Sequence, residues 1–258
     1  MNQKPASSPN LRERIRAGET LLGCFVTWPN AGTIELLGLA GFDFAVIDAE
    51  HGFHGIESIE NLVRASDGVP IPAIVRPPRF DSDVVSRSLD AGAAGVLVPR
   101  VEGSASARAA VENVKFSPEG RRGLGAVRAN RYGTRPLDAF VRESNDRTVV
   151  AVQIETPGAL DELYSIAALP GVDVLFVGPN DLTQALGIPG RTDDPRYREA
   201  LARVAAAAKE NGRAAGIMVG RREQIPELAG MGYRFFTTSD RSLILESARA
   251  WREMVKAG

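Results

Sequence analysis

Two carboxylates and two histidines lie within seven residues in the stretch FDFAVIDAEHGFHG, which runs from Phe42 to Gly55. Asp48, Glu50 and His51 come directly after a run of apolar residues, whereas His54 lies farther into the loop. An imidazole beside carboxylates is suited to proton transfer. A lone loop histidine is more often structural, so His51, at the end of the apolar run, is the stronger candidate for chemistry.

Three other apolar runs also end in polar residues. Arg76 ends one run, Gln153 and Glu155 end the second in QIET, and Asn180 and Asp181 end the third in GPND. In a parallel barrel the carboxyl ends of all strands meet at one mouth, where chemistry is located. Two of these residues also have a structural explanation. Asp181 could cap the next helix, and Arg76 could pair with a barrel carboxylate. Their convergence favours a functional site.

Glu155 and Asp181 are expected on adjacent strands, where two carboxylates suit an open magnesium site with room for substrate oxygens. The lack of a His/Cys cluster argues against structural zinc. A 2-oxo acid could bind such a cation through its carboxylate and ketone oxygens. Arg76 would then stabilise the developing enolate charge, and His51 would move the proton. Asp48 is a candidate to orient the histidine.

Other catalytic groups do not fit the pattern. A Schiff base needs a lysine in a dry pocket, and no lysine ends an expected strand. The lysines are Lys4, Lys115, Lys209 and Lys256. The stretch GLGAVR lacks the third glycine of a dinucleotide fingerprint and does not follow a strand, so we expect no organic cofactor. Cys24, the single cysteine, excludes an intrachain disulfide and is expected to be buried and inert.

The bulk composition is that of an ordinary globular protein, with 44% apolar and 24% charged residues among 258. The 31 basic and 32 acidic residues leave a net charge of -1, which predicts neither a nucleic-acid partner nor a membrane partner. No apolar run approaches the ~20 residues that span a bilayer. Without a secretory signal pattern, we expect a cytoplasmic protein with a frayed tail at residues 1–10.

Eight short apolar runs, each followed by a stretch with helical spacing, predict a single (β/α)8 TIM barrel over residues 11–258. The runs are LLGCFVT near 21, FDFAVID at 42, IPAIVRP at 71, AGVLVPR at 94, TVVAVQIE at 148, VDVLFVGP at 172, AAGIMV at 214 and YRFFTT at 233. Parallel strands covered on both faces have such near-continuous apolar runs.

Helix signals support the same pattern. Asp194 and Pro195 predict a helix start, and Asn30 or Thr33 could cap an earlier helix. The longest interval between strands holds the Gly- and Arg-rich stretch 116–136, for which a functional role is favoured. Arg128 and Arg131 of this stretch could bind a distal substrate carboxylate, although a solvated surface is the stronger reading.

The motifs IDAEH, VRPP, LDAGAAGVLVP, RRGLG, QIET and GPNDL, in this order, resemble the metal-dependent (class II) pyruvate aldolases of the hydroxyoxoheptanedioate and 2-dehydro-3-deoxyglucarate aldolase family. The resemblance covers about residues 20–250. It implies a barrel of the phosphoenolpyruvate/pyruvate-domain type and reversible cleavage of a 4-hydroxy-2-oxo acid to pyruvate and an aldehyde. It also implies a Mg²⁺ or Mn²⁺ cofactor, with Co²⁺ as another divalent option.

The resemblance further implies roles for individual residues. His51 becomes the proton acceptor, Arg76 the enolate stabiliser, and Glu155 with Asp181 the metal ligands. Gln153 and the backbone around Asn180 and Asp181 hold the pyruvate part. The residues that stand where relatives often carry tryptophan, alanine and leucine, and that bear on the aldehyde half, are Phe25, Asn180 and Met218.

Asp90, in SLDAG, falls where the family has a carboxylate thought to raise the basicity of the histidine. The expected elements put Asp90 at the end of a helix on the opposite rim of its own barrel, so either the local path differs or a neighbouring subunit supplies it. The superfamily commonly exchanges a terminal helix, which implies a homo-oligomer, a hexamer built as a trimer of dimers, assembled through SLILESARAWREMVKA.

Two alternatives stay open. The same enolate chemistry could decarboxylate oxaloacetate or cleave an acyl thioester. A different class of protein would bind 2-oxo acids without turnover, as a sensor or scaffold, although the histidine and arginine make this less favoured. Fold alone does not decide among them, because barrels host many reactions.

Overall fold

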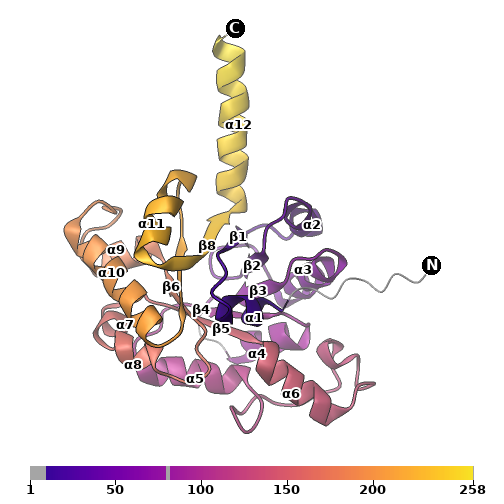
Figure 1. Cartoon of the computed structure of the whole chain (residues 1–258). Helices are drawn as coiled ribbons and strands as arrows, with labels where there is room; N and C mark the ends of the chain where they lie inside the picture. Colours follow the sequence, from indigo (N-terminus) through magenta and orange to yellow (C-terminus); the bar gives the residue numbers. More distant parts are fainter. Residues whose placement is uncertain (1–9, 80–81, 258) are drawn as a thin grey trace.

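The computed structural model describes residues 10–79 and 82–257. Eight parallel strands close into a barrel in which each strand pairs with its neighbours in chain order and the last pairs with the first (Figure 1). The strands are β1 (Leu21–Val26), β2 (Phe44–Asp48), β3 (Ala73–Arg76), β4 (Gly95–Val98), β5 (Val149–Gln153), β6 (Val174–Val177), β7 (Ala214–Met218) and β8 (Tyr233–Ser239). All eight apolar runs therefore form strands, and the predicted (β/α)8 architecture is confirmed.

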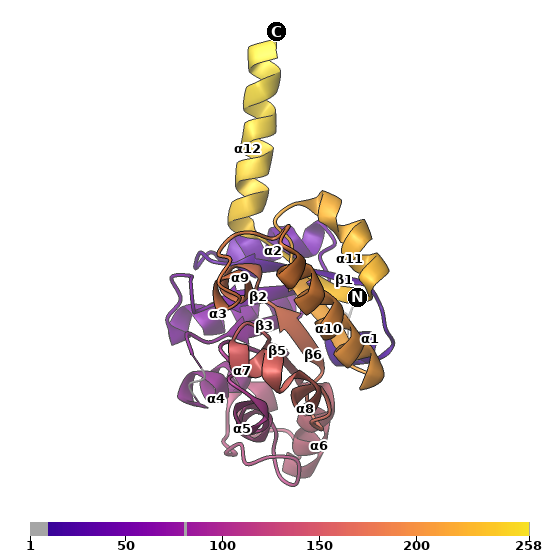
Figure 2. The same cartoon turned by 90° about the vertical axis from the view of Figure 1, so that its left-hand side faces the viewer.

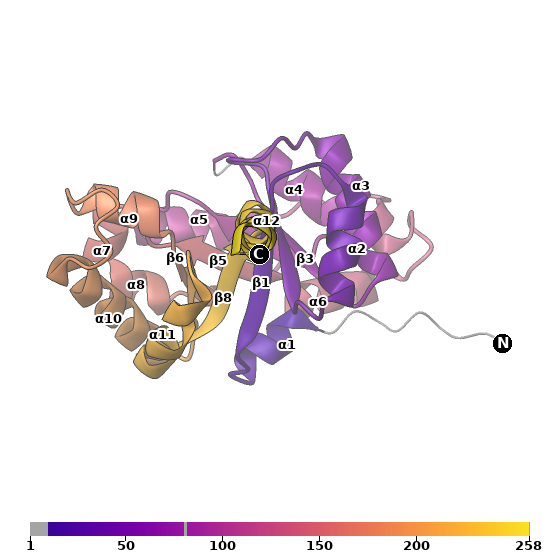
Figure 3. The ribbon, with the colours of Figure 1, turned by 90° about the horizontal axis from the view of Figure 1, so that it is seen from above.

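Helices follow the strands, and most of them cover the outside of the barrel (Figure 3). They are α1 (Leu11–Arg16), α2 (Ala31–Leu39), α3 (Ile56–Gly68), α4 (Ser82–Asp90), α5 (Ser104–Val114), the 3-10 turn η1 (Arg128–Asn130), α6 (Leu137–Arg147), α7 (Pro157–Asp161), α8 (Leu163–Ala167), α9 (Pro179–Ala185), α10 (Pro195–Glu210), η2 (Arg222–Gln224), α11 (Ile225–Met231) and α12 (Asp240–Ala257).

The predicted helix starts agree with the structure. Asn30 caps α2 by accepting a hydrogen bond from Gly32, and Asp194 caps α10 with Pro195 in the first turn. Asn10 caps α1, whereas residues 1–9 of the expected tail lie outside the described residues. Short polar side chains satisfy backbone N–H groups that a helix start leaves without a partner.

Aromatic rings pack against one another in the barrel interior. Phe44 and Phe235 stack with their ring centroids 4.1 Å apart, and Phe176 meets Phe235 edge to face at 6.3 Å. Gly23 of β1 makes room for this packing, because a Cβ at that position would lie 2.2 Å from a ring carbon of Phe44. Leu11 of α1 joins the same cluster, so α1 contributes to the core inside the barrel.

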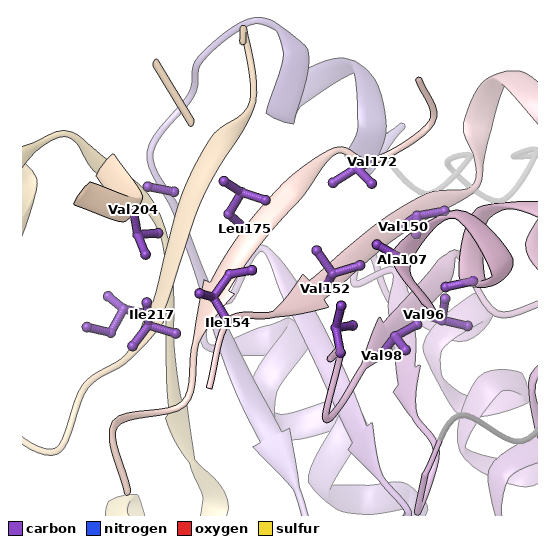
Figure 4. Close-up of a cluster of buried hydrophobic side chains, with 14 of the residues drawn as sticks. Val96, Val98, Ala107, Val150, Val152, Ile154, Val172, Leu175, Val204 and Ile217 are labelled. Carbon is purple, nitrogen blue, oxygen red and sulfur yellow. The ribbon is translucent and has the colours of Figure 1, made fainter. Parts of the chain in front are cut away.

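A second apolar layer lies between the sheet and the helices. Valines that face outward from β4 and β5 pack with Ala107 of α5, and Leu175 and Ile217 lie in the same cluster as Val204 of α10 (Figure 4). Each strand is therefore dry on both faces, which is why the strands have near-continuous apolar sequences. This double layer fixes the strand ends from which the candidate site is built.

Charged side chains with hydrogen-bond partners are buried at the amino end of the strands. Arg12 of α1 donates to Asp173 at 2.7 Å, and Asp173 also accepts the backbone N–H of Val150. The Lys115 ammonium is fully buried and donates to the carbonyl oxygens of Asn145 and Thr148 at 2.6 and 2.7 Å. These contacts tie α1 and α6 to the start of the sheet.

The final helix, α12, projects away from the barrel instead of lying against it (Figures 1 and 2). Most of its large apolar side chains are exposed, including Trp251 and Met254, each at 75%. The base of the helix is fixed, because Asp240 accepts hydrogen bonds from both the N–H and the hydroxyl of Thr27. No helix among the described residues has the length and apolar character needed to cross a membrane.

Candidate active site

A buried arginine between two carboxylates forms one half of the barrel mouth. Arg76 donates to both oxygens of Asp48, at 2.8 and 2.7 Å, and lies 3.2 Å from Glu50. Burial acts to raise the pKa of Asp48, but the arginine and the backbone N–H groups of Glu50 and His51 outweigh it, so this pKa is lowered. Asp48 is thus an anion whose main role is to hold the guanidinium.

The imidazole of His51 is half exposed and reaches into the mouth from the loop after β2. Its Nε2 lies 3.9 Å from a carboxylate oxygen of Glu50, and 54% of the side chain is accessible. The one hydrogen bond from His51 to Asp48 comes from the backbone N–H, at 3.2 Å, and not from the ring. The structure therefore does not support Asp48 as the group that orients the ring. Arg241, at the start of α12, donates to the carbonyl oxygen of His51 and holds this loop from the other side.

The second half of the mouth is built around Glu155. One oxygen accepts the N–H of Arg100 at 2.8 Å, and the other accepts the amide of Gln153 at 2.7 Å. Burial, with the negative charges of Asp181 and Glu50, raises the pKa of Glu155 to about 7. The carbonyl oxygen of the Gln153 amide is buried without a partner among the described residues. A raised carboxyl pKa and an unpartnered buried polar atom are both features that cluster at functional sites.

Asp181 lies in the first turn of α9, close enough to raise the pKa of Glu155. The alternative that this aspartate caps the helix is not observed, because the N-cap is Gly178 and no side chain bonds there. Gly178 allows the backbone to run close to Glu155, since a Cβ at position 178 would lie 2.6 Å from a carboxylate oxygen of Glu155. The two predicted ligands, Glu155 and Asp181, therefore lie near enough for their charges to interact.

Arg100 connects the two halves of the mouth. Its N–H binds Glu155, and its side-chain Nε lies 3.4 Å from Glu50, the carboxylate next to His51 and Arg76. The backbone of Arg100 has a φ of 52°, a left-handed conformation that costs energy for a residue with a Cβ and is often found at functional sites.

Other predicted residues lie elsewhere. Phe25 is buried, and its ring lies under the Arg76 guanidinium at 4.6 Å, where it supports the arginine rather than facing an open space. Asn180 and Met218 both line a cavity of about 470 Å³ beside the mouth, between α9, α10 and α11. This location is compatible with contact to the half of a substrate that extends away from Glu155.

Asp90 is not brought to His51 within one chain. It ends α4 at the amino rim and accepts a hydrogen bond from Arg122 at 2.7 Å. Arg128 also lies away from the mouth, where it donates to Asp67 and to the carbonyl oxygen of Ala91. These contacts give no support, within a single chain, to a role for the Arg128 region in holding the far end of a substrate.

Two residues of the mouth were missed as candidates, namely Glu50 as a partner of Arg76 and Arg100 as the bridge. Both come at or just after the end of an apolar run, so the rule that selected Arg76 also applied to them. A sequence signal was therefore present, but it did not show which strand-end residues would touch.

Comparison with known proteins identifies the family of this chain. The family model described as HpcH/HpaI aldolase/citrate lyase matches residues 21–238. The chain belongs to this family. It is therefore an enzyme, a carbon–carbon lyase of the aldolase kind, and the family resemblance inferred from the six motifs is confirmed.

Individual relatives match over 81% or more of the chain. A hydroxypyruvate/pyruvate aldolase of Roseobacter denitrificans is 32% identical, over 98% of this chain and 100% of its own length. A 5-keto-4-deoxy-D-glucarate aldolase of Klebsiella pneumoniae is 37% identical, over 81% and 82%. The crystal structure of an HpcH/HpaI aldolase/citrate lyase family protein from Burkholderia cenocepacia has a TM-score of 0.90 and 36% identity, over 95% and 98%.

Proposed function

We propose that this aldolase reversibly cleaves a 4-hydroxy-2-oxo acid to pyruvate and an aldehyde, with Mg²⁺ or Mn²⁺ held by Glu155 and Asp181. The substrate class includes 2-keto-3-deoxy sugar acids and 4-hydroxy-2-oxoheptanedioate. One observation carries the proposal: Arg100 links the buried acid at 155 to the Glu50–Arg76 pair beside His51. This link supports a proposal in which a cation site, a fixed positive charge and a base share one mouth.

The residues present fit a divalent cation. Glu155 is buried beside Asp181, and the pKa of its carboxyl is raised to about 7, so an added positive charge would relieve the repulsion between the two acids. Both provide oxygen ligands, which magnesium and manganese prefer, and two carboxylates leave further positions for substrate and water. A bound cation would supply Lewis-acid polarisation of the 2-oxo group.

The side chains of the mouth account for the remaining chemistry. In the cleavage direction His51 removes the proton from the 4-hydroxyl group, directly or through water, as that oxygen becomes the aldehyde carbonyl. The C3–C4 bond breaks, and its electron pair moves to form the enolate of pyruvate. Arg76, held in place by Asp48 and Glu50, presents positive charge to the developing anion. The proton then returns to C3 and gives the methyl group.

The exchange of pyruvate methyl protons tests the enolate step without knowledge of the aldehyde. The protein is incubated with pyruvate in deuterated water with Mg²⁺ or Mn²⁺, and the methyl signal is followed by NMR. We expect metal-dependent loss of the signal, and a decrease of about 10³-fold in its rate for Glu155→Gln. The exposed Glu199→Gln, which removes the same charge from α10, serves as the control. Equal exchange in the Glu155 variant, or exchange without metal, contradicts the proposal.

The alternative reactions would give different products at the same site. Decarboxylation of oxaloacetate releases carbon dioxide, and a thioester lyase releases a free thiol. A 2-oxo-acid-binding protein without activity would show calorimetric binding of pyruvate but no exchange. The relatives named above are aldolases, which favours aldehyde release, measured with a coupled reductase. Aldehyde release slower than carbon dioxide release would favour decarboxylation.

We further propose that α12 is exchanged between subunits of a homohexamer, arranged as a trimer of dimers. The support is the exposed apolar face that includes Ile244, Trp251 and Val255, on a helix that projects from the barrel (Figure 2). Trp251→Glu with Val255→Glu should give smaller particles in analytical ultracentrifugation, whereas Glu253→Gln should not. A monomeric wild type would contradict the assembly.

The single cysteine and the ordinary net charge are the basis for proposing a cytoplasmic location.

A further inference from the structure

The imidazole ring of His51 has few contacts of its own. It makes no hydrogen bond within residues 10–79 and 82–257, and its one ion-pair contact there is the 3.9 Å approach of Nε2 to Glu50. The side chain is also half exposed. Contacts of the ring therefore hold it only loosely, and its direction depends on the backbone of residue 51.

Hydrogen bonds fix the peptide groups on both sides of His51. The N–H of His51 donates to Asp48 at 3.2 Å, and its carbonyl oxygen accepts a hydrogen bond from the guanidinium of Arg241 at 2.9 Å. Because each peptide group is planar, fixing the two groups that flank a residue fixes its φ and ψ. The direction of its Cα–Cβ bond follows. Asp48 and Arg241 therefore set the direction in which the imidazole leaves the backbone.

The side chain of Arg241 is itself held at the junction of β8 and α12. Its Nε donates to the hydroxyl of Thr27 at 3.0 Å, and that hydroxyl donates to the carboxylate of Asp240 at 2.8 Å. Thr27 and Asp240 are both buried. The planar guanidinium can thus reach two acceptors at once, the Thr27 hydroxyl and the His51 carbonyl oxygen. The end of β1 and the start of α12 give the arginine a fixed base.

The loop after β2 also fits closely against the same threonine. A Cβ at Gly52 would lie 2.2 Å from the carbonyl oxygen of Asp48 and 2.9 Å from that of Thr27. The N–H of Phe53 donates to the carbonyl oxygen of Thr27 at 3.1 Å. Thr27 therefore supports the loop directly through its carbonyl oxygen and indirectly through Arg241.

We propose that Arg241 is a positioning residue for the reaction, which sets the direction of the His51 ring through the carbonyl oxygen of His51. The inference rests on the proposed function, in which His51 moves the proton. Anchoring of the loop does not require the arginine, because Ala49 and Phe53 on either side already donate to carbonyl oxygens at the ends of β3 and β1. Water could also solvate the exposed carbonyl oxygen at little cost. What Arg241 adds is a fixed direction.

NMR of the histidine rings and proton exchange of pyruvate together test this role. The full chain is labelled with [13C]histidine and kept in Mg²⁺, and its two ring signals, from His51 and His54, are assigned with His54→Gln. In Arg241→Met, relaxation dispersion should detect μs–ms broadening of the His51 signal, because the ring samples several directions. Loss of charge alone would shift the signal without broadening it.

The kinetics should show the same loss of position. Proton exchange at saturating pyruvate should fall by about 10²-fold in Arg241→Met, the effect of a misplacement of about 1 Å. The half-saturating concentration of pyruvate and the affinity for Mn²⁺ should stay unchanged, because Glu155 and Asp181 are not altered. A purely structural role would instead lower Tm and leave the rate per folded molecule unchanged.

Further variants make the assignment specific. Arg241→Lys keeps the charge and a donor, so its rate should be about tenfold above that of Arg241→Met. Thr27→Val removes the hydroxyl that anchors the arginine and should broaden the same His51 signal, with a smaller loss of rate. Arg108→Met removes an exposed charge from α5 and should change neither the signal nor the rate.

The two measurements separate this inference from the proposed function. A His51 signal that stays sharp in both Arg241→Met and Thr27→Val overturns the positioning role, whatever the rate. A signal that broadens without loss of rate supports the positioning of the ring but contradicts His51 as the base in the proposed function. Equal effects of Arg108→Met on signal and rate would also overturn the assignment to Arg241.

Discussion

The two ends of the barrel both bury charge, but they treat it differently. At the amino end, beneath β5 and β6, Arg12 is bonded to Asp173, and Lys115 is bonded to two carbonyl oxygens. At the carboxyl end, Glu155 is crowded by other acids, and the carbonyl oxygen of the Gln153 amide lacks a partner among the described residues. The first arrangement is complete as it stands, whereas the second places like charges together and leaves a buried polar atom without a partner in the described part of the chain.

This difference distinguishes a structural ion pair from a functional one. Charges that satisfy each other stabilise the fold, and their removal leaves the partner buried and unpaired. Charges held close to others of the same sign cost stability, and such arrangements cluster at functional sites. The contrast predicts that substitutions at the amino end change the free energy of unfolding, whereas those at the carboxyl end change the reaction, with Arg76 affecting both.

Arg76→Met should have the largest effect. It removes positive charge from the enolate, leaves Asp48 buried without its cation, and leaves Glu50 with Arg100 as its remaining arginine partner. We expect pyruvate exchange to fall about 10³-fold and the free energy of unfolding to fall by about 3–5 kcal/mol. NMR exchange and denaturant unfolding measure the two effects. An enzyme that stays fully active would remove the arginine from the mechanism.

The two histidines provide a matched pair. His51→Gln should lower exchange about 10³-fold with little change in stability, because its side chain is half exposed. His54 bonds to the carbonyl oxygen of Val26 at 2.9 Å, so His54→Gln should lower stability and leave exchange per folded molecule nearly unchanged. The reverse pattern in rate and melting temperature would assign the base to the other histidine.

Arg12→Met tests the amino end. It leaves Asp173 buried without its cation, so we expect the free energy of unfolding to fall by about 3–5 kcal/mol. The exchange rate of the folded protein should not change, because α1 lies at the opposite end from the mouth. Urea unfolding and exchange at a temperature where the variant is folded measure both. A large loss of rate in folded protein would show that the two ends are coupled.

The smallest effect is a pH dependence from Lys115. Burial, with the positive charge of Arg12, lowers the pKa of this lysine from 10.5 to about 8. Below pH 8 the lysine is protonated in both the folded and the unfolded state. Between pH 8 and 10.5 the unfolded chain binds more protons, so the free energy of unfolding rises with pH. Relative to Lys115→Met, the free energy of unfolding of the wild type should rise by at most about 3 kcal/mol over this pH window. A difference that is flat with pH would contradict the lowered pKa.

The sequence predicted the eight strands because each was an uninterrupted apolar run, which double-sided burial requires. It also predicted the rim that carries the chemistry, since Arg76 and Glu155 end such runs. It did not predict that Asp48 would hold Arg76 rather than the ring of His51, because the choice depends on side-chain direction across two strands.

Local pattern alone determined the architecture of this protein, the position of its strand ends and the residue types at the mouth. Only the tertiary structure decided which charges meet: Arg100 between Glu50 and Glu155, and Asp90 with Arg122 at the other end. The reason is physical. Burial of a strand is a property of its own apolar residues, whereas an ion pair depends on the distance and direction between side chains far apart in the chain.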